Sequence, residues 1–172
     1  MPFLASIEGR SAFGRPPPVR ASAPASVGGS MLFTASSSSG VSIPNSADVQ
    51  MGTGDFTIEW FQYQLASSGS FQRIFSIGTY AGQSIAMSQE GSDTSKSIYF
   101  WGSSGAQQGT ARNLQGAWYH FAVTRASGSV RVFLGGTQIG TTAANATNFN
   151  DASNVLRLGN ESSTSIGAAF NG

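Results

Sequence analysis

The sequence predicts an all-β domain, an antiparallel two-sheet sandwich, preceded by an extended N-terminal arm. Three observations support this fold class. Short stretches alternate apolar and polar residues with a period of two, Gly, Ser, Asn and Asp recur between them as turn signals, and no segment longer than ten residues shows helical periodicity. Many short strands separated by frequent turns are typical of sandwiches.

The expected strands follow one another along residues 30–172. They are residues 30–33, 40–44, 55–65, 71–78, 84–88, 97–102, 117–125, 130–136, 137–142 and 155–160. The most pronounced is residues 55–65, in which Phe56, Ile58 and Trp60 fall on one face. Because Phe61 and Tyr63 make the opposite face partly apolar too, we expect this strand to be central and covered on one side by the second sheet.

Turn residues define the connections between these strands. The pair Gly135-Gly136 in VRVFLGGTQIG supplies the positive φ that a tight hairpin connection requires. The links GSDTS, SGAQQG and SGS are also expected to be turns. The sequence therefore predicts a hairpin over residues 130–140 and turns at the other links.

Composition limits the possible classes of protein. The 172 residues contain no cysteine, and charged residues make up 10%, against about 25% in an average globular domain. A body of about 140 residues can bury a sizeable core without disulfides, and its weakly charged surface suits a protein packed in an assembly or exposed outside cells. The net charge of +1 predicts no direct nucleic-acid partner, and no apolar run is long enough for a membrane span.

Residues 1–29 form a distinct leader. Its apolar start is broken by Ser6 and ended by Glu8, which does not fit a secretory signal. The prolines 16–18 are incompatible with the continuous helix of a transit peptide. A plain tail and an assembly arm that orders against a neighbouring protein remain as alternatives. The residues assigned to the arm's contacts are Phe3, Leu4, Ile7, Arg10, Phe13 and Arg15.

The order of motifs in the body carries a resemblance. SMLFTASSSSGVSIPNSADVQMGTGDFTIEWFQYQ, RIFSIG, AWYHFAVTR, VRVFLGGTQIGT, VLRLGN and FNG together resemble laminin-G-like, concanavalin A-like jelly-roll domains over residues 30–172. The leader FLASIEGRSAFGRP is similar to the short starts of structural proteins of tailed phages and large DNA viruses. The resemblance implies a virion structural protein, a capsid decoration or a tail or fibre appendage, whose partners are other virion proteins, copies of itself and host glycans. The alternative is an extracellular lectin-like module.

The end of the body departs from the family pattern. In such domains FNG runs on into a final strand near the first strand, whereas this sequence stops at Gly172. Sheets rarely leave an edge bare. We therefore expect the N-terminal arm or a neighbouring subunit to supply the missing pairing.

Catalytic chemistry is not expected. Glycan hydrolysis needs two carboxylates roughly 5–10 Å apart, and none of the eight acids forms the E-x-D-x-E pattern that would place them on one strand. The single histidine, His120, is expected to be packed or hydrogen-bonded on a sheet face. Glu59 is expected to pair with Arg125 or Arg131 on strands of the same sheet, which would fix the register.

Binding residues are predicted in three places. Tyr99 and Trp101 share one strand face and, with Tyr80, could form a platform on which a sugar ring stacks. Asn148 and Asn150 would add hydrogen bonds. Calcium is the one candidate cofactor, with Asp151 as its carboxylate ligand. The alternatives are that the aromatics cover a second layer or a subunit contact, and that the asparagines only cap a turn.

Overall fold

The computed structural model describes residues 29–34, 39–65, 71–78, 85–92, 95–102, 105–108, 113–150, 155–160 and 169–172. The chain divides into two units, Met1–Met31 and Leu32–Gly172. Residues 1–28 lie outside the described residues, so the assembly arm and its six named residues stay a prediction.

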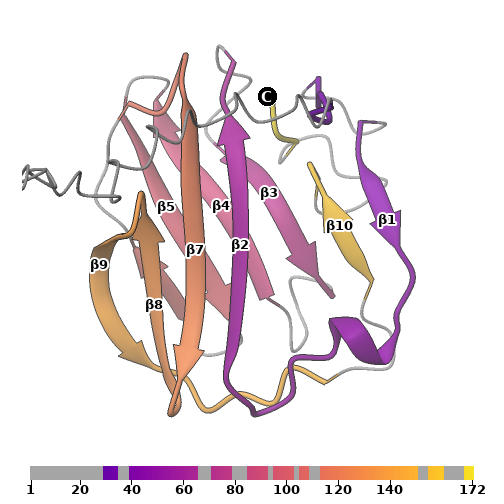
Figure 1. Ribbon diagram of the computed structural model, residues 1–172, viewed down its shortest axis with the longest axis vertical. Helices are drawn as coiled ribbons and strands as arrows, with labels where there is room; N and C mark the ends of the chain where they lie inside the picture. The colour runs from indigo at the N-terminus through magenta and orange to yellow at the C-terminus, as the bar shows by residue number, and fades with distance from the viewer. Residues whose placement is uncertain are drawn as a thin grey trace, which may run out of the picture. The chain divides into compact units, whose positions relative to one another are not determined.

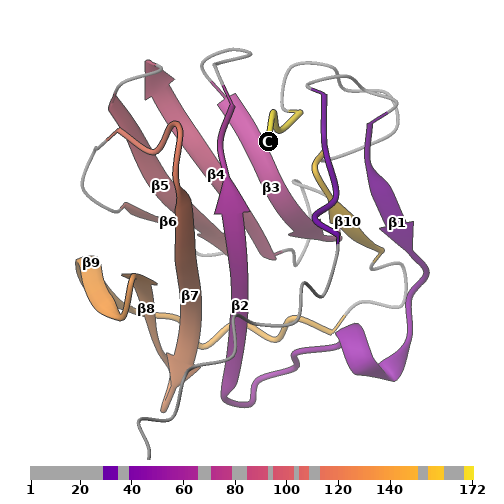
Figure 2. The ribbon, with the colours of Figure 1, turned by 45° about the horizontal axis from the view of Figure 1, so that its top comes forward.

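The second unit is an antiparallel two-sheet sandwich, as expected (Figure 1). The six-stranded sheet has the order β1 (Val41–Ile43), β10 (Leu156–Leu158), β3 (Phe71–Ile77), β4 (Ile85–Ser92), β5 (Ser95–Gly102) and β6 (Gly105–Gln108). The four-stranded sheet has the order β2 (Phe56–Tyr63), β7 (Trp118–Ala126), β8 (Ser129–Leu134) and β9 (Thr137–Ala144). A single 3-10 turn, η1 (Ala47–Val49), is the only helix among the described residues. Figure 2 shows the two layers from a tilted view.

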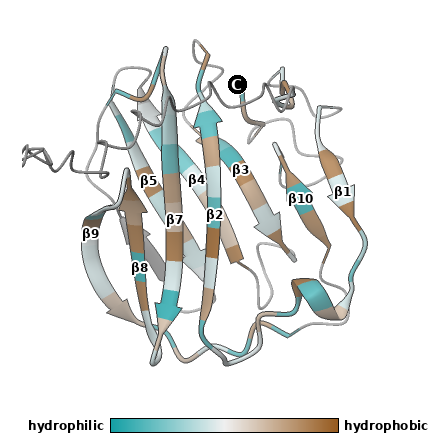
Figure 3. Ribbon diagram, in the orientation of Figure 1, coloured by the Kyte–Doolittle hydropathy of each residue, from teal (hydrophilic) through white to brown (hydrophobic). Residues whose placement is uncertain are grey.

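The core lies between the two sheets and follows the period-two pattern. Ile98 and Phe100 of β5 and Phe121 and Val123 of β7 belong to this core, and all four side chains are fully buried. Trp60 of β2 stacks on Phe121 with ring centroids 5.3 Å apart. Figure 3 shows the resulting alternation of hydrophobic and hydrophilic residues along the strands.

The β8–β9 hairpin has the tight connection that its sequence predicts. Gly135 and Gly136 have φ values of 55° and 79°, a backbone conformation that glycine adopts without steric cost. The amide of Gly135 donates to the carbonyl of His120 at 2.9 Å, which ties the hairpin to β7.

Three expectations about strands are wrong. β2 is an edge strand of the four-stranded sheet and not a central one. One of its faces is covered by the second sheet, as expected, and its outer face carries the exposed Phe61 and the half-buried Tyr63. Part of SGAQQG forms β6 instead of a turn. Residues 30–33 form no strand; instead Phe33 exchanges two backbone hydrogen bonds with Gly172, at 2.8 and 3.1 Å.

Candidate functional site

The outer face of the six-stranded sheet carries a stacked aromatic pair. The rings of Tyr99 and Trp101 lie 5.6 Å apart between centroids and are inclined by 20°. Both side chains are half-buried, while Ile98 and Phe100 between and beside them fill the core. The alternation of β5 therefore places both aromatics on the face directed away from the second sheet, as the sequence predicts.

Two polar side chains of β4 hold this pair in place. The indole Nε1 of Trp101 donates to Ser88 Oγ at 2.8 Å, and the Ser88 hydroxyl donates to Glu90 Oε1 at 2.9 Å. The register brings them together, because Ser88 lies opposite Tyr99 across the β4–β5 ladder. Ser88 is 1% exposed, so its hydroxyl is committed to these bonds and fixes the indole.

The arrangement combines flat apolar surface with hydrogen-bonding groups. Aromatic faces pack against apolar C–H groups of a ligand, while a few placed polar groups orient it. Glu90 is half-buried at the edge of the pair and still has a second carboxylate oxygen. Such a site suits a neutral polyhydroxylated ligand.

Of the other predicted binding residues, the structure describes only Asn148 and Asn150. Tyr80 and Asp151 lie outside the described residues. Asn148 and Asn150 are exposed in the segment after β9, where the Asn150 amide donates to Asn148 Oδ1 at 3.1 Å. This bond is the turn-capping role that the alternative interpretation assigns to asparagine.

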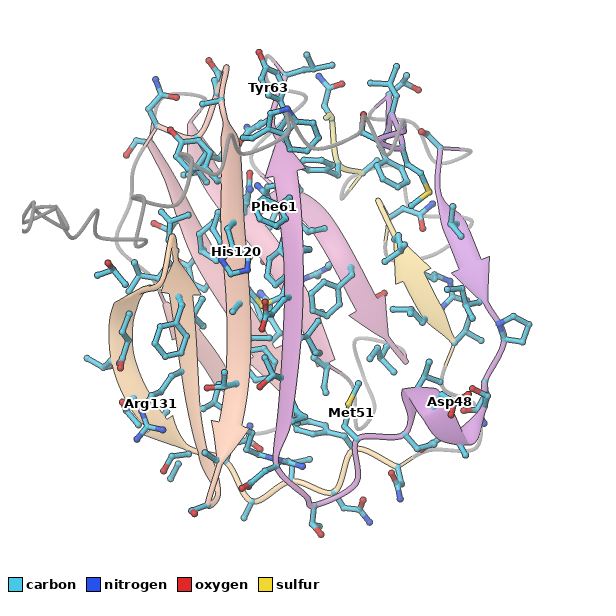
Figure 4. The ribbon with its side chains drawn as sticks, in the orientation of Figure 1. Asp48, Met51, Phe61, Tyr63, His120 and Arg131 are labelled. Carbon is cyan, nitrogen blue, oxygen red and sulfur yellow. The ribbon has the colours of Figure 1, made fainter. Side chains whose placement is uncertain are left out.

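The outer face of the four-stranded sheet carries a second aromatic group, which the sequence analysis missed. Phe61 and Trp118 are 70% and 56% exposed. Phe61 lies 4.9 Å from the ring of His120, and Tyr63 lies 5.7 Å from the ring of Trp118. Figure 4 shows Phe61 and His120 side by side on β2 and β7. The signal was present in the sequence, since Trp118 and His120 alternate on β7 as Phe61 and Tyr63 do on β2.

Glu59 has a different partner from the one expected. Its Oε2 lies 3.2 Å from His120 Nε2, and the two side chains are 60% and 29% exposed. Arg131 shares the sheet but makes no side-chain hydrogen bond with Glu59 or any other described residue. His120 has the hydrogen-bonded role on a sheet face that was predicted for it.

Arg125 points into the sandwich instead, because it has the same parity on β7 as Phe121 and Val123. It is 2% exposed, and its guanidinium donates to the carbonyls of Gly54, Gly52 and Thr147 at 2.6 to 2.8 Å. The rings of Phe56 and Phe149 flank it, each 4.9 Å from Cζ. Burial lowers the pKa of Arg125, and the nearby Asp55 charge acts in the opposite direction. Arg125 is a structural crosslink between two loops.

Neither a metal cluster nor a membrane helix is present in the described part of the chain. No three His, Asp or Glu side chains come together there as ligands. None of its helices has the length and apolar character needed to cross a bilayer.

Residues 35–172 match the family described as the concanavalin A-like lectin/glucanases superfamily, of the laminin-G type. The chain belongs to this family. A search of curated protein sequences finds no match.

Solved structures share the fold at low sequence identity. Domains LG4-5 of the mouse laminin alpha1 chain match with a TM-score of 0.56 and 16% identity, over 81% of this chain and 38% of that one. Domain 4 of AbnA, an extracellular arabinanase from Geobacillus stearothermophilus solved with arabinotriose, matches at 0.55 and 18%, over 82% and 65%. The enzymatically active domain of bacteriophage CBA120 tailspike protein 2 matches at 0.52 and 15%, over 85% and 28%. The chain thus spans less than two thirds of each of these structures.

Proposed function

We propose that the protein is a non-catalytic glycan-binding module displayed on a virion and anchored there through residues 1–29. One observation carries the binding role: the stacked pair of Tyr99 and Trp101, held by Ser88 and bordered by Glu90. Sugar rings stack their apolar C–H faces on aromatic side chains and direct their hydroxyls to neighbouring acceptors. The arabinotriose bound by a domain of similar fold is consistent with this chemistry.

The virion role is supported by two weaker observations. The first is the fold shared with a bacteriophage tailspike, and the second is the proline-stiffened leader with apolar residues at its start. An extracellular lectin-like module is the second candidate, since the same aromatic pair would serve it equally well. In either function, calcium is the candidate cofactor, and Asp151 with neighbouring oxygens would be its ligands.

A glycan array tests the binding role. The full-length protein, with and without calcium, should bind a subset of glycans, and Trp101→Ala should weaken that binding at least about tenfold, as expected for the loss of an aromatic anchor worth roughly 1.4 kcal/mol or more. Trp118→Ala is the matched control, because it removes a tryptophan from the other sheet. Equal binding by both variants, or no binding under either condition, would contradict the proposal.

Light scattering after size-exclusion chromatography tests the anchoring role. The full-length chain should form an assembly or be retained by other virion proteins, and Phe3→Asp with Ile7→Asp should abolish this, because a charge cannot be buried without a partner. A monomer that no virion protein retains would argue for the extracellular lectin.

A further inference from the structure

Most of the flank of the sandwich beside β2 is not covered by any residue that the structure describes. β2 pairs with β7 on one side, and on its other side no described residue bonds to the backbone of residues 56–63. The last residues approach its upper end, where Gly172 lies against the carbonyl of Tyr63 and the Leu65 amide donates to the carbonyl of Asn171 at 3.1 Å. In an antiparallel strand every second residue directs its N–H and C=O outward, so no described residue pairs with this edge of β2 below Tyr63, over about 24 Å.

The inner face next to this edge is covered by described residues only at one end, where Phe33 and Phe170 pack beside Gly159. Trp60 of β2 contacts Phe75 of β3 at 5.3 Å between ring centroids, so β2 lies opposite β3. The neighbouring strands β10 and β1 therefore face no strand of the four-stranded sheet. Figure 1 shows them beyond β2, and Figure 2 shows the same arrangement from another side.

Side-chain exposure gives independent support. Most apolar residues of the core are buried, but eight described ones that pack against it are only partly buried. One of the eight is Tyr119. The other seven lie along this flank: Phe33, Met51, Phe56, Ile58, Trp60, Leu156 and Leu158. Figure 4 shows Met51 at the lower end of the flank. A strand added beside β2 would cover this apolar surface and complete the backbone pairing.

The geometry of the flank excludes β2 of a second copy as its occupant. Two copies could not pair β2 with β2, because each six-stranded sheet extends two strands, about 10 Å, beyond β2. The β10 and β1 strands of the two copies would then occupy the same space. The flank has room for a single extended segment whose alternate side chains are apolar.

We propose that this flank receives the N-terminal segment of a second copy, residues 3–8. Phe3, Ala5 and Ile7 alternate there with Leu4, Ser6 and Glu8, and no proline interrupts the segment before Pro16. The apolar set would cover Leu156 and Leu158, and the other set would lie beside Thr57, Glu59 and Phe61. The inference rests on the arm-mediated assembly of the proposed function and names the surface that the arm uses.

Disulfide trapping tests the contact, because the chain contains no native cysteine. Full-length Ser6→Cys is mixed, in separate oxidations, with full-length Thr57→Cys, Glu59→Cys or Phe61→Cys. The control partner is Gln138→Cys, an exposed residue on β9 at the opposite edge of the same sheet. Since a disulfide forms only where Cα atoms come within about 7 Å, at least one β2 partner should yield about tenfold more mixed disulfide than the control, as quantified by mass spectrometry.

Mixing two single-cysteine variants distinguishes the N-terminal segment of a second copy from that of the same chain. Each chain carries one cysteine, so a mixed disulfide can form only between copies. Equal yields at β2 and at position 138, or none at β2, overturn the inference. A disulfide found only within a single chain that carries both Ser6→Cys and Thr57→Cys also overturns it, because the segment then folds onto its own domain. The glycan array and light scattering of the unmodified protein report on the proposed function separately, so it can stand while this contact fails.

Discussion

Replacement of Arg125 tests the account of the buried guanidinium. Arg125→Met keeps a long side chain between the rings of Phe56 and Phe149 but removes every donor. Three carbonyls that Arg125 now contacts at 2.6 to 2.7 Å, those of Gly52, Gly54 and Thr147, lose their partner. At about 1 kcal/mol for each abandoned acceptor, the free energy of unfolding should fall by about 3 kcal/mol.

Urea denaturation followed by tryptophan fluorescence measures this free energy of unfolding. In a parallel thermal unfolding experiment, a loss of about 3 kcal/mol should lower the Tm of a domain of this size by about 10 °C. Arg131→Met is the control, because Arg131 bonds to no described residue from its side chain, and it should change stability by less than about 0.5 kcal/mol. Arg125→Lys should recover only part of the loss, since an ammonium group cannot reproduce the planar fork of donors. If Arg125→Met costs less than about 1 kcal/mol, the two loops are held by other contacts and the reasoning is refuted.

Three further predictions concern other parts of the sandwich. Gly159→Ala should lower the free energy of unfolding by more than about 2 kcal/mol, because the new Cβ would collide with the Phe33 ring and the backbone φ is 80°. Gly135→Ala has open space around it and should cost about 1 kcal/mol. Thermal unfolding of the two variants compares these losses. Glu59→Gln should change stability by less than about 1 kcal/mol in urea, since the pair with His120 is largely exposed, and a larger loss would show a buried network. Ile98→Ala should lower stability by about 3 kcal/mol or more because the side chain is fully buried, while Thr57→Ala on the surface should have little effect by the same measurement.

Much of the fold was predictable because strand alternation is local. The core face of β5 could be assigned from Ile98 and Phe100 alone, and the outward position of Tyr99 and Trp101 followed from it. The tight β8–β9 connection followed from two adjacent glycines, whose conformational freedom is intrinsic to the residue. These features depend on residues one or two positions apart.

The position of each strand within its sheet was harder to predict from the sequence. Phe61 and Tyr63 gave β2 a second apolar face, which predicted a central strand, although both belong to an aromatic group on an edge. The parity of Arg125 with Phe121 and Val123 could be read from the sequence and indicated the core side. Its carbonyl partners could not, because they lie in loops 22 to 73 residues away. Glu59 was predicted to need a partner, and only the β2–β7 register selected His120.

The sequence by itself determined the fold class, the inward face of the main strands, the hairpin turn and the aromatic pair on β5. Only the tertiary structure decided which strands lie at the edges, where Arg125 finds its carbonyls, and that β10 and β1 extend past β2. The reason is physical: the direction of a side chain follows from its own backbone, whereas neighbours across a sheet are chosen by the packing of the whole chain.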